Sequence, residues 1–390
     1  MSRRLINSKG RILLFLLLPA LLAECRGEGE KKTVRPNSLA AVPAARLAYG
    51  FAPDVEAPPG AGPFEETKLK SVQDDFDTRR KDDRLLRTVV SPDGQRALAL
   101  YDTGETQEGE FRIDMYASDG RFLRNLTPPE LSGAFAPMVA WSPDGNQIAF
   151  IGRKTLAQET PPGMLPETGP EPLPTPPPDF GGVQVFDTEQ LYVCDRDGFG
   201  LRPLTTRNGL IYFYLSWAPD GHALAALACR EDEWDARASE SKLPAGRPRL
   251  VETDGRERLL DDRLTEAGPV WSPDSSKVAA GFEAEVKIYD AATVETPTQA
   301  AVPLRDALLK ASAEYDEKNL KGQKGGGGAP VSFNPIVRLY WPEDRSLFAQ
   351  TAYVRLYASE PVVTFQRWHK LTLSIQATRL GRLRARARVL

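Results

Sequence analysis

Histidine and cysteine are scarce in this chain, which limits the catalytic and metal sites that it could build. Among 390 residues there are two histidines, His222 and His369, and three cysteines. His222 directly follows a Pro-Asp-Gly turn, so we expect an exposed side chain with no catalytic role. No role is predicted for His369. A serine hydrolase would also need a Gly-x-Ser-x-Gly nucleophile elbow, and the sequence contains none.

Neither sign of charge dominates, and no long apolar run follows the N-terminus. The 50 basic and 53 acidic residues give a formal net charge of -3, which creates no global field to attract nucleic acid or anionic lipid. We therefore predict no nucleic-acid partner. After residue 25, no segment is apolar enough to span a bilayer.

Residues 1–25 have the three parts of an export signal: a basic start, an apolar run over 12–23 and a short polar exit. The apolar run is shorter than the roughly 20 residues that cross a bilayer. Cys25 stands where a bacterial lipobox places its lipidated cysteine, although Glu24 replaces the small residue usual before it. Two outcomes stay open: membrane attachment through a lipid on Cys25, or simple cleavage near Ala23. Both predict an extracytoplasmic location, periplasmic or at the cell surface.

The other two cysteines, Cys194 and Cys229, lie in apolar runs that read as strands. An oxidising compartment would allow them to pair. A buried free thiol is the more common outcome for cysteine in such runs, so we predict two unpaired core thiols.

Composition divides the rest of the chain into three parts. Residues 26–84 are rich in Pro, Gly, Ala and charge, which predicts a largely unpaired tether. Over residues 85–358, short apolar runs alternate with Asp-Gly and Pro-Asp turns, which is an all-β texture. Residues 359–390 lack this pattern and end in an arginine-rich stretch, which predicts a solvated basic tail.

A short turn recurs through residues 85–358 and is the strongest signal in the chain. Its copies are Val90–Gly94, Trp141–Gly145, Trp217–Gly221, Trp271–Ser275 and a degenerate Trp341–Asp344. An apolar strand is expected after each copy, at 96–101, 147–151, 223–229, 277–282 and 346–351. Proline presets the turn, aspartate bonds the amides ahead of it, and glycine accepts a positive φ. The residues expected to define the repeat are Trp141, Pro143, Asp144, Gly145, Trp217, Pro219, Asp220, Gly221, Trp271, Pro273 and Asp274.

An Asp-Gly hairpin follows the first three copies, at residues 119–120, 197–198 and 254–255. After the fourth copy the strand 287–290 is present, but its turn and partner strand look lost. Two hairpins in series make a four-stranded meander, which is one blade of a β-propeller. We predict an all-β propeller with four clear blades and a degenerate fifth, five to six in total. The tryptophans should pack between blades, because one blade cannot bury both of its faces.

Insertions enlarge two of the intervals between copies. A proline-rich loop at 155–182 occupies the second interval, because proline cannot donate to a β ladder. The segment 302–330 combines a surface helix over 302–321, with Leu304, Leu308 and Ala311 at helical spacing, and a glycine hinge at 325–328. We expect this helix to be a lid or contact element rather than part of the core.

The run from Leu191 to Thr205, followed by Trp217–Gly221, resembles the WD40-like Pro-Asp repeats of TolB-type propellers. It is similar also to the related propeller of prolyl-oligopeptidase-like proteins. The resemblance covers residues 85–358. It implies six or more blades, export, and the binding of other proteins or peptides.

Two other motifs have simpler explanations than a ligand site. Asp195–Gly198 opens like a calcium loop, but Thr206 stands where such a loop needs a glutamate. The glycine run at 325–328 lacks the Lys-Ser/Thr of a phosphate loop. We predict no metal, no cofactor and no catalytic residue.

The predicted function is a non-catalytic extracytoplasmic scaffold that holds a protein or peptide partner on its loop-bearing face. The alternative is a propeller-based hydrolase or lyase with its site at the central channel.

Overall fold

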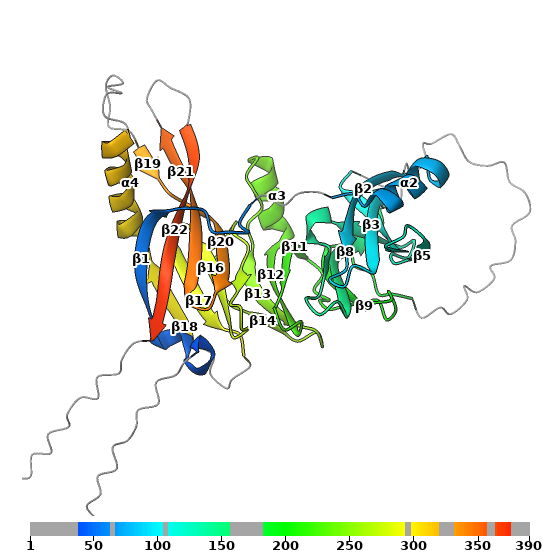
Figure 1. The fold of residues 1–390 in the computed structure, drawn as a ribbon, viewed down its shortest axis with the longest axis horizontal. Helices are drawn as coiled ribbons and strands as arrows, with labels where there is room; N and C mark the ends of the chain where they lie inside the picture. The colour runs from blue at the N-terminus through cyan, green and yellow to red at the C-terminus, as the bar shows by residue number, and fades with distance from the viewer. Residues whose placement is uncertain are drawn as a thin grey trace, which may run out of the picture. The chain divides into compact units, whose positions relative to one another are not determined.

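The computed structural model describes residues 38–62, 67–103, 108–156, 182–292, 298–319, 331–356 and 363–375. The predicted export signal, Cys25, most of the proline-rich loop and the glycine hinge lie outside these ranges. The described chain is mostly antiparallel strand, in sheets of five, nine, four and four strands (Figure 1). Among the helices of these ranges, none has the length and apolarity needed to cross a membrane.

The nine-stranded sheet contains two meanders. The first meander is β2 (Arg84–Val90), β3 (Arg96–Asp102), β4 (Glu110–Ala117) and β5 (Phe122–Asn125). The second meander is β7 (Ala140–Trp141), β8 (Gln147–Lys154), β9 (Gln190–Asp195) and β10 (Arg202–Pro203). Strand β6 (Leu131–Ala134) joins them, because it pairs with β4 on one side and with β8 on the other.

The two four-stranded sheets are meanders of the same kind. The third meander is β11 (Leu210–Trp217), β12 (Ala223–Arg230), β13 (Arg247–Glu252) and β14 (Glu257–Leu259). The fourth meander is β15 (Val270–Trp271), β16 (Lys277–Phe282), β17 (Glu285–Asp290) and β18 (Gln299–Pro303). Strand β18 pairs along β17, so the prediction that the fourth copy has lost its last strand is wrong. Without an Asp-Gly turn between them, the pairing left no local signal.

The fifth meander is completed by a strand from the other end of the chain. It consists of β20 (Ile336–Glu343), β21 (Ser346–Leu356), β22 (Val363–Ile375) and β1 (Leu47–Val55), with β19 (Val331–Phe333) on the far edge of β21. Strand β1 pairs antiparallel with β22, and Leu47 lies opposite Ile375 (Figure 1). The predicted tether over 26–84 and tail over 359–390 are therefore wrong for these two strands. Because β1 and β22 pair across most of the chain, no turn joins them and no local pattern indicates the pairing.

A buried lysine ties the chain before β1 to the fourth meander. Lys277, only 1 % exposed, donates to a carboxylate oxygen of Asp290 at 2.9 Å and to the carbonyl of Val42 at 2.8 Å. The same Asp290 oxygen accepts from the backbone amide of Ala44 at 3.0 Å. Burial opposes ionisation of Asp290, but hydrogen bonds from Thr298 and Lys277, together with the Lys277 charge, keep its pKa below the usual value. The buried Lys277–Asp290 pair therefore holds the backbone at Val42 and Ala44, just before β1, against the fourth meander.

Helix α2 (Lys70–Arg79) also lies within the predicted tether and packs on the first meander. Its buried residues are Val72 and Phe76, and Phe76 contacts Tyr101 with ring centroids 5.4 Å apart. The charged stretch that suggested a solvated tether supplies the outer face of this amphipathic helix. Helix α2 lies close to the turn at Gly120: a Cβ atom at this position would be 2.4 Å from the carbonyl oxygen of Ser71.

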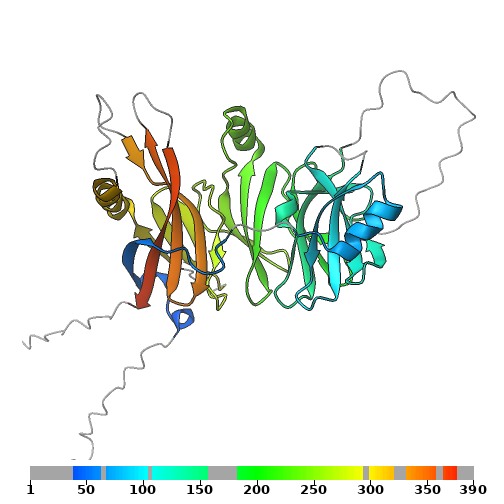
Figure 2. The same ribbon diagram turned by 45° about the horizontal axis from the view of Figure 1, so that its top comes forward.

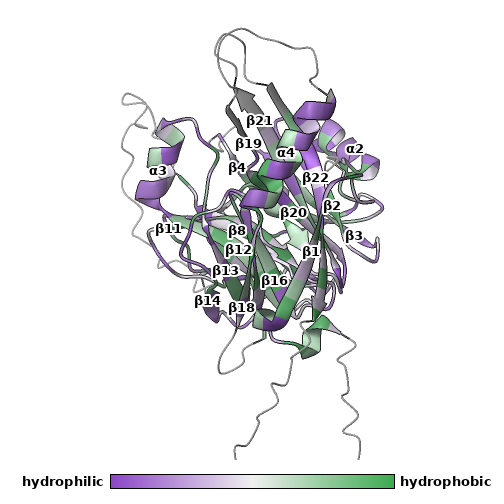
Figure 3. Ribbon diagram, turned by 90° about the vertical axis from the view of Figure 1, so that its left-hand side faces the viewer, coloured by the Kyte–Doolittle hydropathy of each residue, from purple (hydrophilic) through white to green (hydrophobic). Residues whose placement is uncertain are grey.

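Helix α3 (Glu231–Ser239) lies between β12 and β13 of the third meander, and helix α4 (Arg305–Asn319) follows the fourth meander. Helix α4 agrees with the predicted helix to within three residues at each end. Leu308 and Ala311 are buried, and Leu308 belongs to the core of the fifth meander. The expectation that this segment stays out of the core is therefore wrong for one face of α4. Figure 3 shows hydrophobic and hydrophilic residues along this helix.

Neighbouring meanders lie side by side (Figure 2), and their apolar side chains form shared cores. Leu98 and Ile113 of the first meander pack with Ile148 and Phe150 of the second. Strands β3, β12 and β16 are buried along nearly their whole length, which explains why they read as continuous apolar runs. The described residues form five meanders and do not show a ring that closes on itself.

Candidate functional site

The recurring tryptophans link each meander to the preceding one. The indole nitrogen of Trp141 donates to the carbonyl of Val89 at 3.0 Å, and that of Trp271 donates to Ser216 at 3.0 Å. Trp217 makes the equivalent bond to Ala140 at 3.3 Å. All three rings are under 10 % exposed. In contrast, Trp341 donates to Asp344 within its own turn, as expected for a degenerate copy.

The Ser-Pro-Asp-Gly turns share one hydrogen-bond pattern. Ser142 donates to Asp144 at 2.5 Å, Asp144 accepts the amide of Asn146 at 3.1 Å, and the Ser142 hydroxyl accepts the amide of Gln147 at 2.9 Å. These donors hold the pKa of Asp144 below its usual value. Gly145 has a φ of 70°, which glycine adopts without strain. Pro143 and Gly145 therefore serve turn geometry, as do Pro219 with Gly221, and Pro273 with Asp274.

The turn of the fourth copy replaces glycine by serine. Ser275 keeps a left-handed φ of 59°, which costs a residue with a side chain about 1 to 2 kcal/mol. Its hydroxyl accepts the backbone amide of Asp220 at 3.0 Å. The serine therefore adds a bond to the turn of the third meander.

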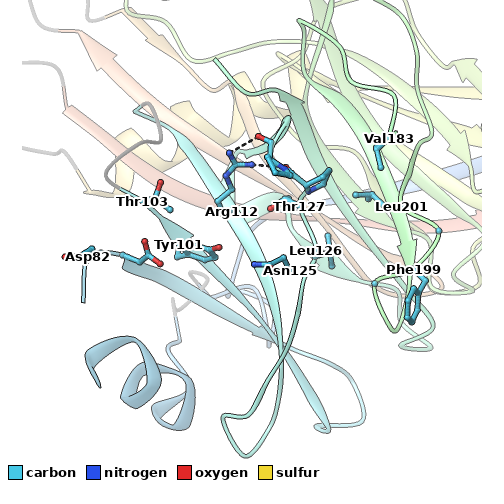
Figure 4. A pocket seen from close by; sticks show the side chains of 15 residues that line it. Asp82, Tyr101, Thr103, Arg112, Asn125, Leu126, Thr127, Val183, Phe199 and Leu201 are labelled. Atoms are coloured by element: carbon cyan, nitrogen blue, oxygen red, sulfur yellow. Dashed lines mark hydrogen bonds between the residues drawn. The ribbon is translucent and has the colours of Figure 1, made fainter. Parts of the chain in front are cut away.

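A groove with a volume of about 1040 Å³ lies between the outer edges of the first two meanders (Figure 4). Tyr101, Thr103 and Asp82 lie toward one end, and Phe199 lies toward the other. Its lining mixes acidic, amide, hydroxyl, aromatic and aliphatic side chains, and includes Asp83, Arg112, Asn125, Leu126, Thr127, Val183 and Leu201. Such a mixture suits a ligand that presents both apolar and hydrogen-bonding groups.

A buried carboxylate anchors two residues of the groove. Asp114 is 1 % exposed and accepts from Tyr101 at 3.3 Å and from the Asn125 amide at 2.8 Å. Arg80, at the end of α2, forms an ion pair with its other oxygen. Burial raises the pKa of Asp114, and the Arg80 charge opposes that rise. Both oxygens are engaged by these groups, so Asp114 acts as an anchor for the groove residues Tyr101 and Asn125.

Two arginines fix the walls of the groove. Arg112 donates to the carbonyl oxygens of Pro128, Pro129 and Leu131, each at 2.9 Å, which holds the chain between β5 and β6 (Figure 4). Arg124 crosses to the second meander, where its guanidinium lies 3.6 Å from the centroid of the Phe199 ring. Phe199 remains 58 % exposed, so one face of an ordered aromatic ring is presented to solvent. Because its guanidinium stacks on this ring, Arg124 restrains the position of Phe199.

The two histidines have different surroundings. His222 is exposed, as predicted. His369 is 1 % exposed, stacks on Phe51, and its Nε2 lies 2.9 Å from the hydroxyl of Thr351. Its Nδ1 accepts the backbone amide of Asp54 at 3.3 Å, so the ring proton sits on Nε2 and is donated to Thr351. This tautomer cannot deprotonate the threonine, which argues against a hydroxyl nucleophile here.

The remaining predicted residues have structural surroundings. Cys194 and Cys229 are free and buried, as predicted. Asp195 accepts the amides of Asp197 and Phe199, at 2.9 and 2.8 Å, within a hairpin turn. Among the described residues, no group of three His, Cys, Asp or Glu side chains could hold a metal ion.

The sequence patterns did not identify the groove. Its lining comes from strands and loops spread over residues 82–201, and few of them belong to the repeat. The one available signal was Phe199, a large aromatic between two glycines in an otherwise polar turn, where exposure is unusual enough to suggest function.

No family model matches this sequence, and no curated protein matches it. Among solved structures, the chain is similar to a protein described as TolB from Agrobacterium tumefaciens, at 13 % identity and a TM-score of 0.30, over 76 % of this chain and 90 % of that one. It is similar also to prolyl oligopeptidase B from Galerina marginata, at 10 % identity and a TM-score of 0.41, over 75 % of this chain and 36 % of that one. For dipeptidyl peptidase 4 of Porphyromonas gingivalis the identity is 12 % and the TM-score 0.36, over 72 % and 46 % of the two chains. The chain thus spans less than half of either peptidase, and these values describe backbone likeness without assigning a function.

Proposed function

We propose that the five meanders are blades of a TolB-like propeller that acts outside the cytoplasm as a non-catalytic scaffold for a protein or peptide partner. The groove between the first two meanders is the proposed contact site. The observation that carries this proposal is the 1040 Å³ groove itself, with its ordered, half-exposed Phe199 at one end.

The chemistry of the groove suits a polypeptide segment. Phe199, Leu126 and Leu201 offer apolar contacts, whereas Asn125 and Thr127 offer hydrogen bonds. An exposed aromatic side chain held in place by its neighbours is the usual anchor of a protein interface, because little conformational entropy is lost on binding. The arginine clamps described above keep the two walls in position before any partner arrives.

Beside the groove, β5 pairs only with β4 among the described strands. Its two end residues are exposed and its two central residues are half-buried. An extended peptide could add to such an edge through backbone hydrogen bonds. This mode predicts binding that depends weakly on peptide sequence except at the Phe199 contact.

Capture of partners from an envelope fraction tests the scaffold role. Immobilised wild type and Phe199→Ala are compared, with Leu243→Ala as the matched control, because Leu243 is also exposed, at 67 %, but does not line the groove. Proteins retained by wild type and Leu243→Ala but not by Phe199→Ala would support the proposal. Equal retention by all three would reject the groove as the contact site.

A substrate screen tests the alternative of a hydrolase or lyase. Purified protein is incubated with peptide and glycan libraries, with and without divalent metal. Turnover above the level of a heat-denatured sample would reject the non-catalytic role. Mass spectrometry of the mature N-terminus tests the location: a diacylated Cys25 supports attachment to a membrane, whereas an unmodified start near Glu24 supports release.

A further inference from the structure

A second cavity, distinct from the groove, opens between the first two meanders and helix α3. Its volume is about 590 Å³. The lining comes from β2, β3, β4, β6, β8 and α3 and from connecting residues. It consists of Arg84, Leu86, Asp102, Thr103, Glu108, Gly109, Glu110, Phe111, Ala134, Phe135, Ala136, Arg153, Glu189 and Trp234. Apart from Thr103, none of these residues lines the groove.

Aromatic rings form one wall of this cavity. Trp234 lies against Phe135, with centroids 5.8 Å apart and planes at 64°, and against Phe213 at 5.7 Å. Phe111 is buried beneath them at 1 % exposure. Trp234 itself is half-buried, so its ring is available to a ligand. An electron-rich indole face favours a cation within about 6 Å.

Carboxylates also line the cavity. Glu110 and Glu189 are 3 % and 8 % exposed, and both reach Arg153, at 3.4 and 3.0 Å. At the rim, Arg84 pairs with Asp102. The lining thus holds four acidic side chains, Asp102, Glu108, Glu110 and Glu189, against two basic ones, Arg84 and Arg153, which is an excess of two negative charges. The buried Arg87 does not line the cavity but donates to the carbonyl of Ala136, which does, so its charge lowers the acidic excess around the cavity to one.

We infer that this cavity binds a basic side chain, the ammonium of lysine or the guanidinium of arginine, presented by a polypeptide. The acidic excess attracts the charged head, and the aromatic wall accepts its alkyl stem and adds a cation–π contact. An anionic ligand would be repelled by the same acidic excess. A neutral apolar ligand would displace water from Glu189 and would offer this carboxylate no hydrogen bond in its place, which is unfavourable. The polypeptide carrier follows from the proposed function, but the recognition of the basic head stands on the cavity alone.

Small probes separate this inference from the scaffold role. The probe is N-acetyl-lysine N-methylamide, and its neutral counterpart is N-acetyl-norleucine N-methylamide. Indole 15N resonances of the six tryptophans report where the probe binds, because the Trp234 signal is assigned by its loss in Trp234→Phe. We expect the lysine probe, but not the norleucine probe, to shift the Trp234 signal, with an effect that weakens as salt is added.

Charge-removing variants complete the test. Glu189→Gln should weaken binding of the lysine probe about tenfold, which corresponds to about 1.4 kcal/mol of binding free energy. Glu231→Gln is the matched control, because Glu231 is exposed on the same helix as Trp234 and does not line the cavity. If Glu189→Gln lowers the melting temperature, Glu108→Gln removes an exposed lining charge with no buried partner to disturb.

The inference is overturned if the two probes bind equally, if no probe moves the Trp234 signal, or if Glu231→Gln weakens binding as much as the lining variants do. The scaffold proposal has separate readouts. Loss of partner capture in Phe199→Ala with lysine binding unchanged would uphold both, whereas lysine binding without any captured partner would leave the cavity assigned and reject the scaffold.

Discussion

The indole nitrogen of Trp271 lies 3.0 Å from the carbonyl oxygen of Ser216, to which it donates across two sheets. This bond joins the fourth meander to the third, and its equivalents at Trp141 and Trp217 join the second to the first and the third to the second. The tryptophan before the Pro-Asp turn thus connects neighbouring meanders by a hydrogen bond and is also a core residue.

Trp271→Phe should therefore destabilise the protein by about 1 to 3 kcal/mol, because the carbonyl of Ser216 loses its partner at a partly buried position. Urea unfolding followed by circular dichroism measures the change. Trp341→Phe is the matched control: the same atoms are removed, but the lost bond is a 3.3 Å contact inside one turn. An equal loss in both variants would contradict the assigned role of the bond between sheets.

Ser275 permits strain and bonding to be measured separately. Ser275→Ala removes the bond to the Asp220 amide but keeps the φ of 59°. Ser275→Gly removes the bond and relieves the backbone. We expect the alanine variant to be less stable than wild type, and the glycine variant to be more stable than the alanine variant by about 1 kcal/mol. Equal stability of the two variants would show that the left-handed turn carries no strain.

Gly133 in β6 lies against the ring of Phe111. A Cβ at Gly133 would lie 2.3 Å from that ring, whereas a Cβ at Gly50 in β1 would meet nothing within 4 Å. Gly133→Ala should cost about 1 to 3 kcal/mol through overpacking, and Gly50→Ala should be nearly neutral. The double variant Gly133→Ala with Phe111→Leu should recover part of the loss. No recovery would mean that the backbone at Gly133, and not the ring, is limiting.

His369 makes stability depend on pH. Burial, followed by the Arg367 charge, lowers its pKa to about 4, whereas an unfolded histidine titrates near 6.5. Between these values the unfolded state binds more protons, so the free energy of unfolding falls as the pH falls from about 7 to 4. The histidine contributes about 3 kcal/mol of this fall.

The pH prediction is checked by comparing wild type with His369→Gln, because other groups titrate over the same range. The difference in unfolding free energy between the two proteins should shrink by about that amount from pH 7 to pH 4. A difference that stays constant with pH would contradict a neutral buried imidazole.

The two described cysteines should be inert in the folded protein. Burial raises the pKa of Cys194 to about 12 and that of Cys229 to about 11, so neither forms much thiolate near neutral pH. In a Cys25→Ser background, a thiol reagent should label neither residue at pH 8 until denaturant is added, and should then label both. Rapid labelling of either one in the native state would show that its strand opens locally.

Local patterns predicted the strands after the turns closely. Strand β16 occupies the expected residues 277–282, and β3, β8, β12 and β21 begin where they were predicted. These elements lie next to their own turns, so proline, aspartate and glycine indicate both their start and their register. Burial of the two thiols was predictable for the same reason, because both lie in such strands.

The same patterns failed where partners are distant. The charged residues of α2 concealed a helix, because its apolar stripe holds only Val72 and Phe76. The groove and the second cavity combine side chains from several elements, and nothing in one element indicates the others. Arg112 and Glu189 acquire their roles only from what the fold places beside them.

The sequence by itself determined the hairpins of this protein, because each turn and the two strands that it joins are contiguous in the chain. Only the tertiary structure decided that β1 completes the fifth meander with β22, that β6 joins the first two meanders, and that Trp234, Glu110 and Glu189 line one cavity. Those contacts depend on which surfaces remain to be buried after the hairpins have formed, and that choice is made by packing between distant segments.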